Sequence, residues 1–523
     1  MVSFSSAPAA IKLRKLAENP FDLTASDALT SDRIKQFYTC GSRLHLFYAT
    51  ERITTPILEA LFELARERDV MSKMREMQSG NKINSSEGRA VLHTAIRDLF
   101  SPTSKSAKTQ EAINQAKEEI EKLKLFLQEI DRENLFTDIV QIGIGGSCLG
   151  PKCITHALQY TAKKRRQAHF LSNVDPDGVA KLLMEINPAT TLFIAVSKSG
   201  TTLETLTNLY FVIEHLKKCG VDPKNHLISV TEKGSSMDDP KKYRRSFYIW
   251  DYIGGRYSVS SMVGGVIISA ITGVDTFIEF LRGAHSMDRT ALKEDPLSNL
   301  PLLSALLNIW NRNFLGFPTK AILPYSEVLL YLPAHLQQCD MESNGKRVDN
   351  MGNKVSFGTG PVIWGEVGTN EQHSFYQLLH QGTDVVPSEF IGFKNCQYHM
   401  DVQFQGTSSQ NKLLSNLLAQ VFALAVGKSD QNANKVFPGN RPSRILFAKQ
   451  LDPYTLGALL SYFEHTIAFE GFLWGINSFD QEGVQLGKGI AKQILRHFSK
   501  EESKESVQER VALASLIECI EGI

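Results

Sequence analysis

Hydroxyl side chains crowd the junction between an apolar run and a helix-like run, and this pattern favours phosphate binding. The run TLFIAVS ends at Ser197, and Lys198, Ser199, a glycine, Thr201 and Thr202 separate it from LETLTNLYFVIEHL. The start of a helix offers free backbone N–H groups and a positive dipole end, which suit an anion. The order of residues differs from a Walker loop, in which the lysine follows the glycines and precedes Ser or Thr. The alternative is a hydroxyl that only caps the helix.

A carboxylate and an amide share one face of another expected helix. In YLPAHLQQCDMESNGK, Pro333 can open a helix and Asn344-Gly345 can close it, so that Gln338 and Glu342 are neighbours at i and i+4. A carboxylate in that position could act as a general base. The alternative is a solvated helix end.

Two cationic side chains each follow or adjoin glycines, which let a backbone approach a ligand closely. Arg256 comes after two glycines in WDYIGGRYSVSS and could steady an anion. Lys488 stands between Gly487 and Gly489, where small neighbours leave its ammonium group approachable. An exposed structural arginine and an ordinary surface lysine are the alternatives.

A histidine in WGEVGTNEQHSFYQLLHQG could shuttle protons. Thr369 and Gln372 have the spacing of a capping box, which predicts that His373 lies in the first or second turn of a helix. The positive end of a helix disfavours the imidazolium, so that a neutral imidazole is expected. The alternative is a half-buried helix histidine.

The glycines of IVQIGIGGSCLGP resemble part of a dinucleotide fingerprint. Gly143 and Gly145 fit the pattern GxGxxG, but Cys148 occupies the third glycine position. Asp175, after the next apolar run, is the one feature that supports a ribose-binding reading. Glycines that serve only tight strand-to-helix packing are the alternative. No histidine pair has metal-ligand spacing, and no GxSxG elbow occurs.

Composition is that of an ordinary globular protein, and it excludes several classes of function. The chain has 523 residues, of which 42% are hydrophobic and 22% charged, with a net charge of +1. The dense basic run at residues 163–166 reads as a solvated helix end, so we expect no nucleic-acid partner. The longest apolar stretch, residues 258–274, falls short of a membrane span and predicts a buried helix. Seven widely spaced cysteines suit a reduced, cytoplasmic protein.

Short apolar runs alternate with helices over most of the chain, which predicts α/β domains with mostly parallel sheets covered on both faces. Residues 1–110 look mostly helical. We expect α/β domains over residues 111–285 and 286–500, and a helical tail over residues 501–523.

Taken in order, these stretches resemble the glucose-6-phosphate isomerase (phosphoglucose isomerase) family. The resemblance rests on GIGGSCLGP, SNVDP, SKSGTTLET, GGRYS, QQCDMESNGK, GTNEQHSFYQLLHQG and GVQLGKGIAKQ, and it covers roughly residues 80 to 500. It implies two doubly wound sugar-isomerase (SIS) domains in a homodimer with active sites at the interface. It also implies reversible conversion of glucose 6-phosphate to fructose 6-phosphate, a step of glycolysis and gluconeogenesis, without a metal or organic cofactor.

The resemblance also implies roles for individual residues. Glu342 would move the proton between C2 and C1, and Arg256 would stabilise the enediolate. His373, reaching in from the partner subunit, and Lys488 would assist ring opening. The substrate would be bound by Ser147, Ser197, Lys198, Ser199, Thr202, Thr205, Gln338 and Gln481.

Some positions depart from the usual family pattern. Ser199 replaces a threonine, and Gly200 replaces a bulky aromatic residue, so we expect a more flexible loop. Glu371 stands where glycine is common, which would change the turn before His373 or add charge near it. A tryptophan that often follows the GGRYS motif is absent. Two other functions remain open at this stage: a non-catalytic sugar-phosphate sensor and a dinucleotide-dependent oxidoreductase.

Overall fold

The computed structural model describes residues 3–101, 105–162, 166–499, 515–517, 519–520 and 522–523. The chain forms two compact units, Met1–Phe479 and Asp480–Ile523, and each is described by itself. Most of the basic run, residues 163–165, and most of the expected helical tail, residues 501–514, lie outside the described residues. Arg166 is buried and donates to the Ala270 carbonyl at 3.2 Å, so this member of the run is structural rather than solvated.

The first sheet is wholly parallel and has the strand order β4-β3-β5-β6-β7. Its strands are β3 (Asp138–Ile142), β4 (Gln167–Leu171), β5 (Thr191–Val196), β6 (Leu227–Thr231) and β7 (Arg245–Tyr248). These strands confirm the alternation of apolar runs with helices that the sequence predicted for residues 111–285.

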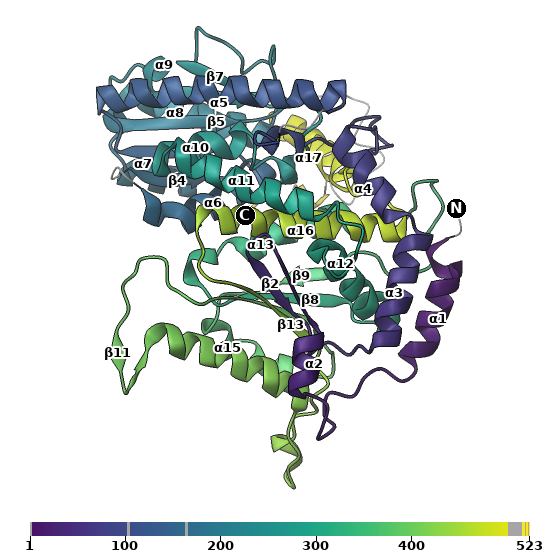
Figure 1. Cartoon of the computed structure of the whole chain (residues 1–523). Coiled ribbons are helices and arrows are strands. Elements are labelled where there is room, and N and C mark those ends of the chain that lie inside the picture. Colours follow the sequence, from purple (N-terminus) through teal and green to yellow (C-terminus); the bar gives the residue numbers. More distant parts are fainter. Residues whose placement is uncertain (1–2, 102–104, 163–165, 500–514, 518, 521) are drawn as a thin grey trace. The chain divides into compact units, whose positions relative to one another are not determined.

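Both faces of this sheet are covered, because successive side chains of a strand point to opposite faces. Phe193 of β5 packs with apolar residues of α7 (Pro176–Glu185) and α8 (Leu203–Lys218). Ile194 packs on the other side with residues of α5 (Ala107–Glu133), α6 (Leu149–Leu158) and α10 (Met262–Thr272). Figure 1 shows the long helix α5 running beside this sheet, next to β7. The predicted doubly wound α/β fold class is confirmed.

The strand order places a topological switch point between β3 and β5. The chain leaves the carboxyl end of β3 toward β4 on one side, and the chain from β5 continues toward β6 on the other. In doubly wound sheets, ligands bind in the crevice outside the carboxyl ends of such strands. The GIGGS turn follows β3 and the SKSGTT loop follows β5, so the two glycine- and hydroxyl-rich stretches flank this point.

A second sheet repeats this order in its parallel part. The strand order is β1-β2-β13-β10-β8-β9, and the strands β8, β9, β10 and β13 are parallel. Their bounds are Thr319–Pro324, Val362–Trp364, Ser388–Phe393 and Ser443–Ala448. The helices that follow or cover them are α12 (Leu300–Ile309), α13 (Leu332–Asn344), α14 (Tyr376–Gln381), α15 (Ser409–Val426) and α16 (Pro453–Trp474).

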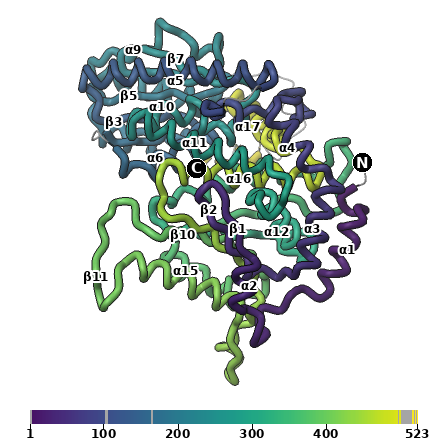
Figure 2. The backbone as a smooth tube through the Cα atoms, in the orientation of Figure 1, coloured from purple at the N-terminus to yellow at the C-terminus, as the bar shows by residue number. Residues whose placement is uncertain are grey.

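The N-terminal region contributes strands as well as helices, which the mostly helical expectation missed. β1 (Tyr38–Gly41) and β2 (Leu44–Phe47) form a hairpin that pairs antiparallel with β13 and extends the second sheet. The pairing joins segments that are almost 400 residues apart in the chain, and Figure 2 shows the purple hairpin β1–β2 against the green C-terminal half. The helices of this region are α1 (Pro8–Ala17), α2 (Ser31–Gln36), α3 (Thr55–Glu67) and α4 (Val70–Ser79).

Buried helices join the two sheets. Every residue of α10 is buried, as the sequence predicted for residues 258–274. Every residue of α16 from Thr455 to Trp474 is buried too, and this helix lies between the two sheets in Figure 1, where it packs on α11 (Val274–Thr290). None of the helices in the described part of the chain is long and apolar enough to cross a membrane.

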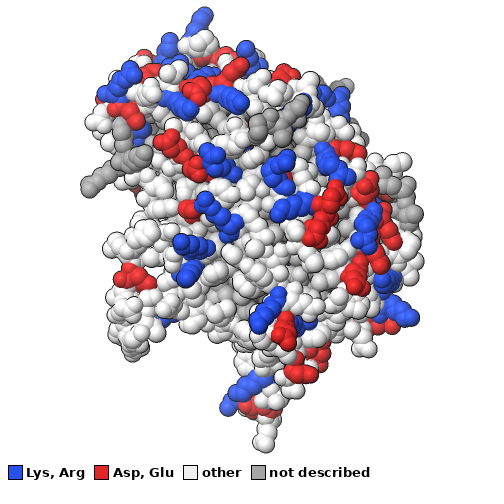
Figure 3. Space-filling model, in the orientation of Figure 1, with Lys and Arg blue, Asp and Glu red and all other residues white. Residues whose placement is uncertain are grey.

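A short hairpin, β11 (Gln403–Phe404) and β12 (Thr407–Ser408), precedes α15. On the face shown in Figure 3, basic and acidic side chains are intermixed, in keeping with the net charge of +1. The second unit contains the helix α17 (Gln485–Phe498).

Candidate active site

The two loops at the switch point of the first sheet contact the loop that carries Arg256. A Cβ atom on Gly146 would come within 2.1 Å of the Gly255 carbonyl oxygen, so only glycine permits this approach of the two backbones. Gly145 has a φ of +59° and lies against the side-chain amide of Gln338. The glycines of the GIGGS turn therefore bring the end of β3 against Arg256 and α13, and they serve close packing around a site.

Buried hydrogen bonds hold the turn after β3 in place. Gln141, on β3, donates from Nε2 to the Ser147 carbonyl at 2.7 Å and to the Val263 carbonyl at 3.2 Å. Ser147 itself is half-buried. The acid proposed for ribose binding has another role: Asp175 caps α7 by accepting from the Asp177 N–H at 3.0 Å.

The hydroxyl-rich loop after β5 is not explained by helix capping. Thr202 occupies the N-cap position of α8, yet its side chain makes no capping hydrogen bond. Its Oγ1 lies 2.9 Å from Ser197 Oγ, and Ser199 Oγ lies 2.8 Å from Thr201 Oγ1. The hydroxyls thus cluster at the open start of α8, beside its free N–H groups, which is the arrangement that suits an oxyanion.

Gly200 gives this loop a tight fit against the loop after β6. Its φ is +70°, and an added Cβ would lie 3.0 Å from the hydroxyls of Ser235 and Ser236. Ser236 Oγ donates to the Gly200 carbonyl at 2.7 Å. A bulky aromatic residue would not fit here, so the departure from the usual family pattern matches the local packing.

Lys198 connects the hydroxyl-rich loop to the loop that carries Arg256. Its Nζ donates to the carbonyl oxygens of Asp251 at 2.8 Å and Ile253 at 3.1 Å, and Glu232 lies 3.9 Å away. Burial lowers the pKa of this ammonium group. The side chain therefore fastens two loops together, while its backbone remains part of the hydroxyl-rich loop.

The predicted helix around Gln338 and Glu342 is confirmed as α13, and it brings a carboxylate to Arg256. Glu342 Oε2 lies 3.3 Å from Arg256 Nη1. The arginine side chain is only 2% exposed, so it is not an exposed structural arginine. Glu342 keeps 20% of its side chain exposed and Gln338 is half-buried, so this face of the helix is not simply solvated.

Several predicted site residues carry buried oxygen atoms that make no hydrogen bond to other described residues. These atoms are Thr205 Oγ1, Gln338 Oε1 and Glu342 Oε2, the last of which has only its ion pair with Arg256. Most buried polar side-chain atoms in proteins are hydrogen-bonded, and each exception calls for an explanation, such as a catalytic role, a bound ion or a water. Their occurrence on α8 and α13 supports a ligand site at these helices.

His373 lies on the surface, and its local structure differs from the prediction. It ends a 3-10 helix, Asn370–His373, and is exposed rather than half-buried in a helix. The predicted capping box is wrong: Thr369 makes no side-chain cap, and Gln372 Nε2 donates to Tyr325 Oη at 2.8 Å instead. A tertiary partner has replaced the local one.

Glu371, the unusual residue beside His373, is fully buried. It accepts a hydrogen bond from Tyr376 Oη at 3.2 Å. Burial raises the pKa of this carboxyl group, which favours its neutral form. The residue therefore anchors the turn before His373.

Gln481 and Lys488 belong to the second unit. Gln481 precedes the 3-10 helix Glu482–Val484, and Lys488 lies on α17.

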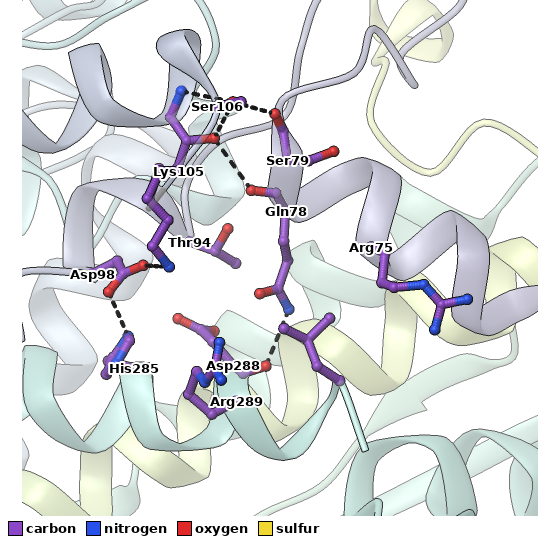
Figure 4. Close-up of a pocket in the computed structure, with 13 residues that line it drawn as sticks. Arg75, Gln78, Ser79, Thr94, Asp98, Lys105, Ser106, His285, Asp288 and Arg289 are labelled. Carbon is purple, nitrogen blue, oxygen red and sulfur yellow. Dashed lines mark hydrogen bonds and ion pairs between the residues drawn. The ribbon is translucent and has the colours of Figure 1, made fainter. Parts of the chain in front are cut away.

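A separate pocket of about 210 Å³ contains none of the residues predicted to bind or transform a substrate (Figure 4). Lys105 forms an ion pair with Asp98, and His285 Nδ1 lies 3.5 Å from Asp98 Oδ1. Gln78 Nε2 donates to the Asp288 carbonyl at 3.1 Å. These charged and polar groups are engaged with one another, so this pocket offers less to an anionic ligand than the hydroxyl-rich loop before α8.

Sequence patterns missed the residues that surround Arg256. Its Nε donates to Ser343 Oγ at 2.6 Å and its Nη2 donates to the Ser478 carbonyl at 2.7 Å. Tyr257 Oη lies 2.8 Å from the same serine oxygen. The only signal in the sequence is that Ser343 adjoins Glu342 and Tyr257 adjoins Arg256, and adjacency does not reveal a tertiary contact.

The parallel sheets define a doubly wound α/β protein, and the polar loops at the switch point of the first sheet form a candidate ligand site at its strand ends. A family model described as phosphoglucose isomerase matches residues 47–516. The glucose-6-phosphate isomerase of Protochlamydia amoebophila (strain UWE25) is 52% identical over 507 residues, which cover 96% of this chain and 94% of that protein. That of Chlamydia pneumoniae is 50% identical over 488 residues, with 92% of each chain covered.

Solved structures agree with these relatives. The crystal structure of a glucose-6-phosphate isomerase from Chlamydia trachomatis superposes with a TM-score of 0.96 at 46% identity, covering 99% of this chain and 100% of that one. A hypothetical protein from Thermus thermophilus has a TM-score of 0.66 at 27% identity, covering 85% of this chain and 99% of that one. The chain belongs to the phosphoglucose isomerase family.

Proposed function

We propose that this chain interconverts glucose 6-phosphate and fructose 6-phosphate through ring opening and an enediol or enediolate intermediate. The observation that carries the proposal is the Glu342 carboxylate held 3.3 Å from the Arg256 guanidinium, beside the loops of the switch point. The relatives named glucose-6-phosphate isomerase, at about half identity over nearly the whole chain, support it.

The proposed chemistry is a proton transfer that needs a base and a cation. Glu342 removes the proton from C2 of the open-chain sugar and returns it to C1. Negative charge develops on the substrate oxygens as the enediolate forms, and Arg256 stabilises it electrostatically. The C2 alcohol is oxidised to a ketone while the C1 aldehyde is reduced to an alcohol, so the electrons balance within the substrate. A positioned general base contributes roughly 10²–10⁴-fold to the rate.

The phosphate group of the substrate is proposed to bind at the start of α8. Ser197, Ser199 and Thr202 supply hydroxyls there, and the buried Thr205 Oγ1, one turn further along, is a donor with no partner among the described residues. Lys198 shapes this loop by tying it to Asp251 and Ile253. The phosphate does not react, so its binding energy can be used to orient the sugar.

The remaining roles follow the family resemblance. Ser147 and Gln338 line the sugar, and Gln481 also binds substrate. His373 and Lys488 assist ring opening, because opening a cyclic sugar requires proton transfer to the ring oxygen and from the C1 hydroxyl. The exposed position of His373 on the surface of the first unit is consistent with service in a neighbouring subunit.

A homodimer with active sites at the interface is part of the same proposal. Exposed apolar side chains gather on and before the hairpin β11–β12, and contiguous exposed apolar surface marks an interaction site. Tyr398, Met400, Val402 and Phe404 are 58%, 81%, 61% and 64% exposed. We propose a cytoplasmic location from the wide spacing of the cysteines, which suits a reducing compartment.

The same domain boundaries remain part of the proposal: a mostly helical N-terminal extension to residue 110, and α/β domains over 111–285 and 286–500, followed by the tail. Each parallel strand set lies within one of these α/β ranges, and the hairpin β1–β2 crosses from the extension into the second sheet.

A turnover assay with the purified chain tests the proposed function. Glucose 6-phosphate is added without added metal or nucleotide, and fructose 6-phosphate is followed with time. We expect many turnovers per chain and approach to the same equilibrium from either sugar phosphate. Tight, saturable binding of glucose 6-phosphate without product would instead favour a sugar-phosphate sensor. Saturable binding of NAD in calorimetry would revive the oxidoreductase.

A further inference from the structure

A buried serine joins the proposed base to the proposed cation. Ser343 follows Glu342 in the last turn of α13 and is completely buried. Its Oγ accepts a hydrogen bond from Arg256 Nε at 2.6 Å and lies 2.8 Å from Tyr257 Oη. Two consecutive residues of the helix thus contact two consecutive residues of the Arg256 loop, which fixes the helix and the loop to each other.

The hydrogen bonds that Arg256 makes to Ser343 and Ser478 limit how Glu342 can bind its guanidinium group. A carboxylate binds guanidinium most strongly through two parallel hydrogen bonds, at about 2.7–2.9 Å. Here Nε is engaged by Ser343 Oγ and Nη2 by the Ser478 carbonyl at 2.7 Å. The Glu342 carboxylate is left with Nη1, at 3.3 Å. A two-point grip, which would hold the carboxylate in place and withdraw it from a substrate proton, is therefore disfavoured.

The partners of Ser343 are themselves held firmly. The Tyr257 ring stacks on the ring of His93 with centroids 4.8 Å apart and an angle of 16° between the planes, and both residues are buried. On the helix side, Asn344 Nδ2 donates to the Ile467 carbonyl at 3.1 Å, and its Oδ1 accepts from Ser478 Oγ at 2.7 Å. Neither the tyrosine nor the end of α13 can move freely to compensate for a lost hydroxyl.

We propose that Ser343 is a positioning residue for the isomerisation: its hydroxyl holds Arg256 Nε and so fixes the guanidinium plane in the orientation that presents Nη1 to Glu342. The inference rests on the proposed function. Ser343 does not touch the substrate and acts through the base and the arginine.

Removing the hydroxyl tests this role. In Ser343→Ala, the guanidinium of Arg256 loses one of the hydrogen bonds that fix its plane beside Glu342, and a small misplacement of reacting groups costs on the order of tenfold to hundredfold in rate. We expect kcat for glucose 6-phosphate to fall by about that factor while KM stays within about threefold, because the phosphate loop is untouched. The deuterium isotope effect on kcat, measured with substrate deuterated at C2, is expected to stay or rise, because the slowed step is proton transfer.

Two further variants separate positioning from general damage to the core. Tyr257→Phe keeps the buried ring but removes the hydroxyl that contacts Ser343, and we expect a smaller change in the same direction. This variant also serves if Ser343→Ala does not fold. Ser304→Ala is the matched control, since Ser304 is completely buried and hydrogen-bonded to Tyr462 in another part of the core. It should lower the melting temperature without changing kcat or the isotope effect.

The outcomes are distinct. A Ser343→Ala enzyme with kcat within twofold of wild type would overturn the inference, and so would a loss of kcat accompanied by a fall of the isotope effect toward unity. A rise in KM that matches the loss in kcat would overturn it as well. If the wild-type chain itself fails to isomerise glucose 6-phosphate, the proposed function fails. If wild type isomerises and Ser343→Ala matches it, only the role of Ser343 fails.

Discussion

At the scale of residues, the proposed site contains buried side-chain oxygen atoms that lack hydrogen-bond partners among the described residues. Thr205 Oγ1 and Gln338 Oε1 make no hydrogen bond to other described residues, and Glu342 Oε2 has only a long ion pair. A buried polar atom without a partner destabilises the fold by about 1–3 kcal/mol. A bound ligand can offset this cost, and all three of these atoms lie on residues proposed to meet the sugar phosphate.

The Thr205 hydroxyl provides a direct test of the proposed phosphate site. Thr205→Val keeps the shape of the side chain and removes the donor, and a hydrogen bond to a charged group contributes about 1.5–3 kcal/mol. We expect KM for glucose 6-phosphate to rise by roughly tenfold or more, with a smaller change in kcat, in steady-state assays.

Thr207, on the exposed side of the same helix, offers a matched control. Thr207→Val should leave both constants unchanged. An unaltered KM in Thr205→Val would show that the phosphate does not reach this turn of α8.

Residue types could be read from the sequence, but their tertiary partners could not. The hydroxyls after β5 and the carboxylate on α13 stand out by type and spacing alone. Ser343 and Tyr257 do not, because a buried serine or tyrosine is unremarkable until its neighbour across the fold is known. The failed capping box has the same cause, since Gln372 has an equally good partner in Tyr325, about 50 residues away in the chain.

At the scale of elements, the loops of the first sheet and the helix α13 form one connected assembly. Lys198 ties the loop after β5 to the carbonyls before Arg256, and Gly146 lets the loop after β3 contact the same segment. The switch point brings the loops after β3 and β5 to the same edge of the sheet. The contacts of Gly146 and Lys198 hold both loops against the segment that carries Arg256. Local strain is avoided because glycine occupies the positions with positive φ in both loops.

The histidine on α13 predicts how this element responds to acid. Burial lowers the pKa of His335 to about 4, against about 6.5 in an unfolded chain. Between pH 6.5 and pH 4 the unfolded chain binds a proton at this histidine and the folded chain does not. The free energy of unfolding therefore falls as the pH is lowered through this range. Cys339 Sγ lies 3.4 Å from Nε2 of the ring, and a thiol does little to stabilise an imidazolium.

We expect the free energy of unfolding of the wild-type chain to fall by about 2 kcal/mol from this group alone between pH 7 and pH 4.5. Urea unfolding across this range should show a shallower dependence on pH in His335→Gln, whatever its stability at pH 7. His399→Gln, at an exposed position, is the control and should keep the wild-type slope. Equal slopes in wild type and His335→Gln would contradict the assignment.

Elements with strong local signals were predicted well, and short paired strands were not. The strands β3, β5 and β6 and the helices α8, α10 and α13 match their apolar periodicity and their bounding residues. The hairpin β1–β2 is two strands of four residues, and its pairing partner β13 lies almost 400 residues away, so no window of sequence contains the pair. The strand β7 was missed for another reason: it has only four residues, RSFY, and these give no clear apolar run, although its partner β6 lies nearby in the chain.

At the scale of the whole molecule, we propose that each active site is built from two chains. Glu342 and Arg256 are brought together within the first unit, whereas His373 is exposed on its surface. A two-fold dimer in which each chain lends a histidine to its partner accounts for both observations, because such an interface repeats the same contact twice.

Complementation between two inactive variants tests this arrangement. Glu342→Gln and His373→Asn are each expected to lose most activity. When equal amounts are refolded together, half of the dimers combine the two chains, and each such dimer has one site with both residues intact. We expect recovery of about a quarter of wild-type activity, as follows from random pairing in a two-fold dimer.

The contrasting outcomes are clear. If His373 serves its own chain, every site in the mixture carries one defect, and activity stays at the level of the separate variants. Double-variant chains mixed with wild type control for the refolding yield. The number of chains in the particle, measured by light scattering, should be two.

The central claim is that Glu342 carries the proton between C2 and C1, and exchange with solvent measures this most directly. Glucose 6-phosphate is incubated with the chain in D₂O, and deuterium at C2 is followed by NMR. We expect wild type to incorporate deuterium and Glu342→Gln to do so more slowly by roughly 10²–10⁴-fold, the contribution of a positioned base. The variant should still bind glucose 6-phosphate with close to wild-type affinity. Incorporation by Glu342→Gln at the wild-type rate would contradict the account.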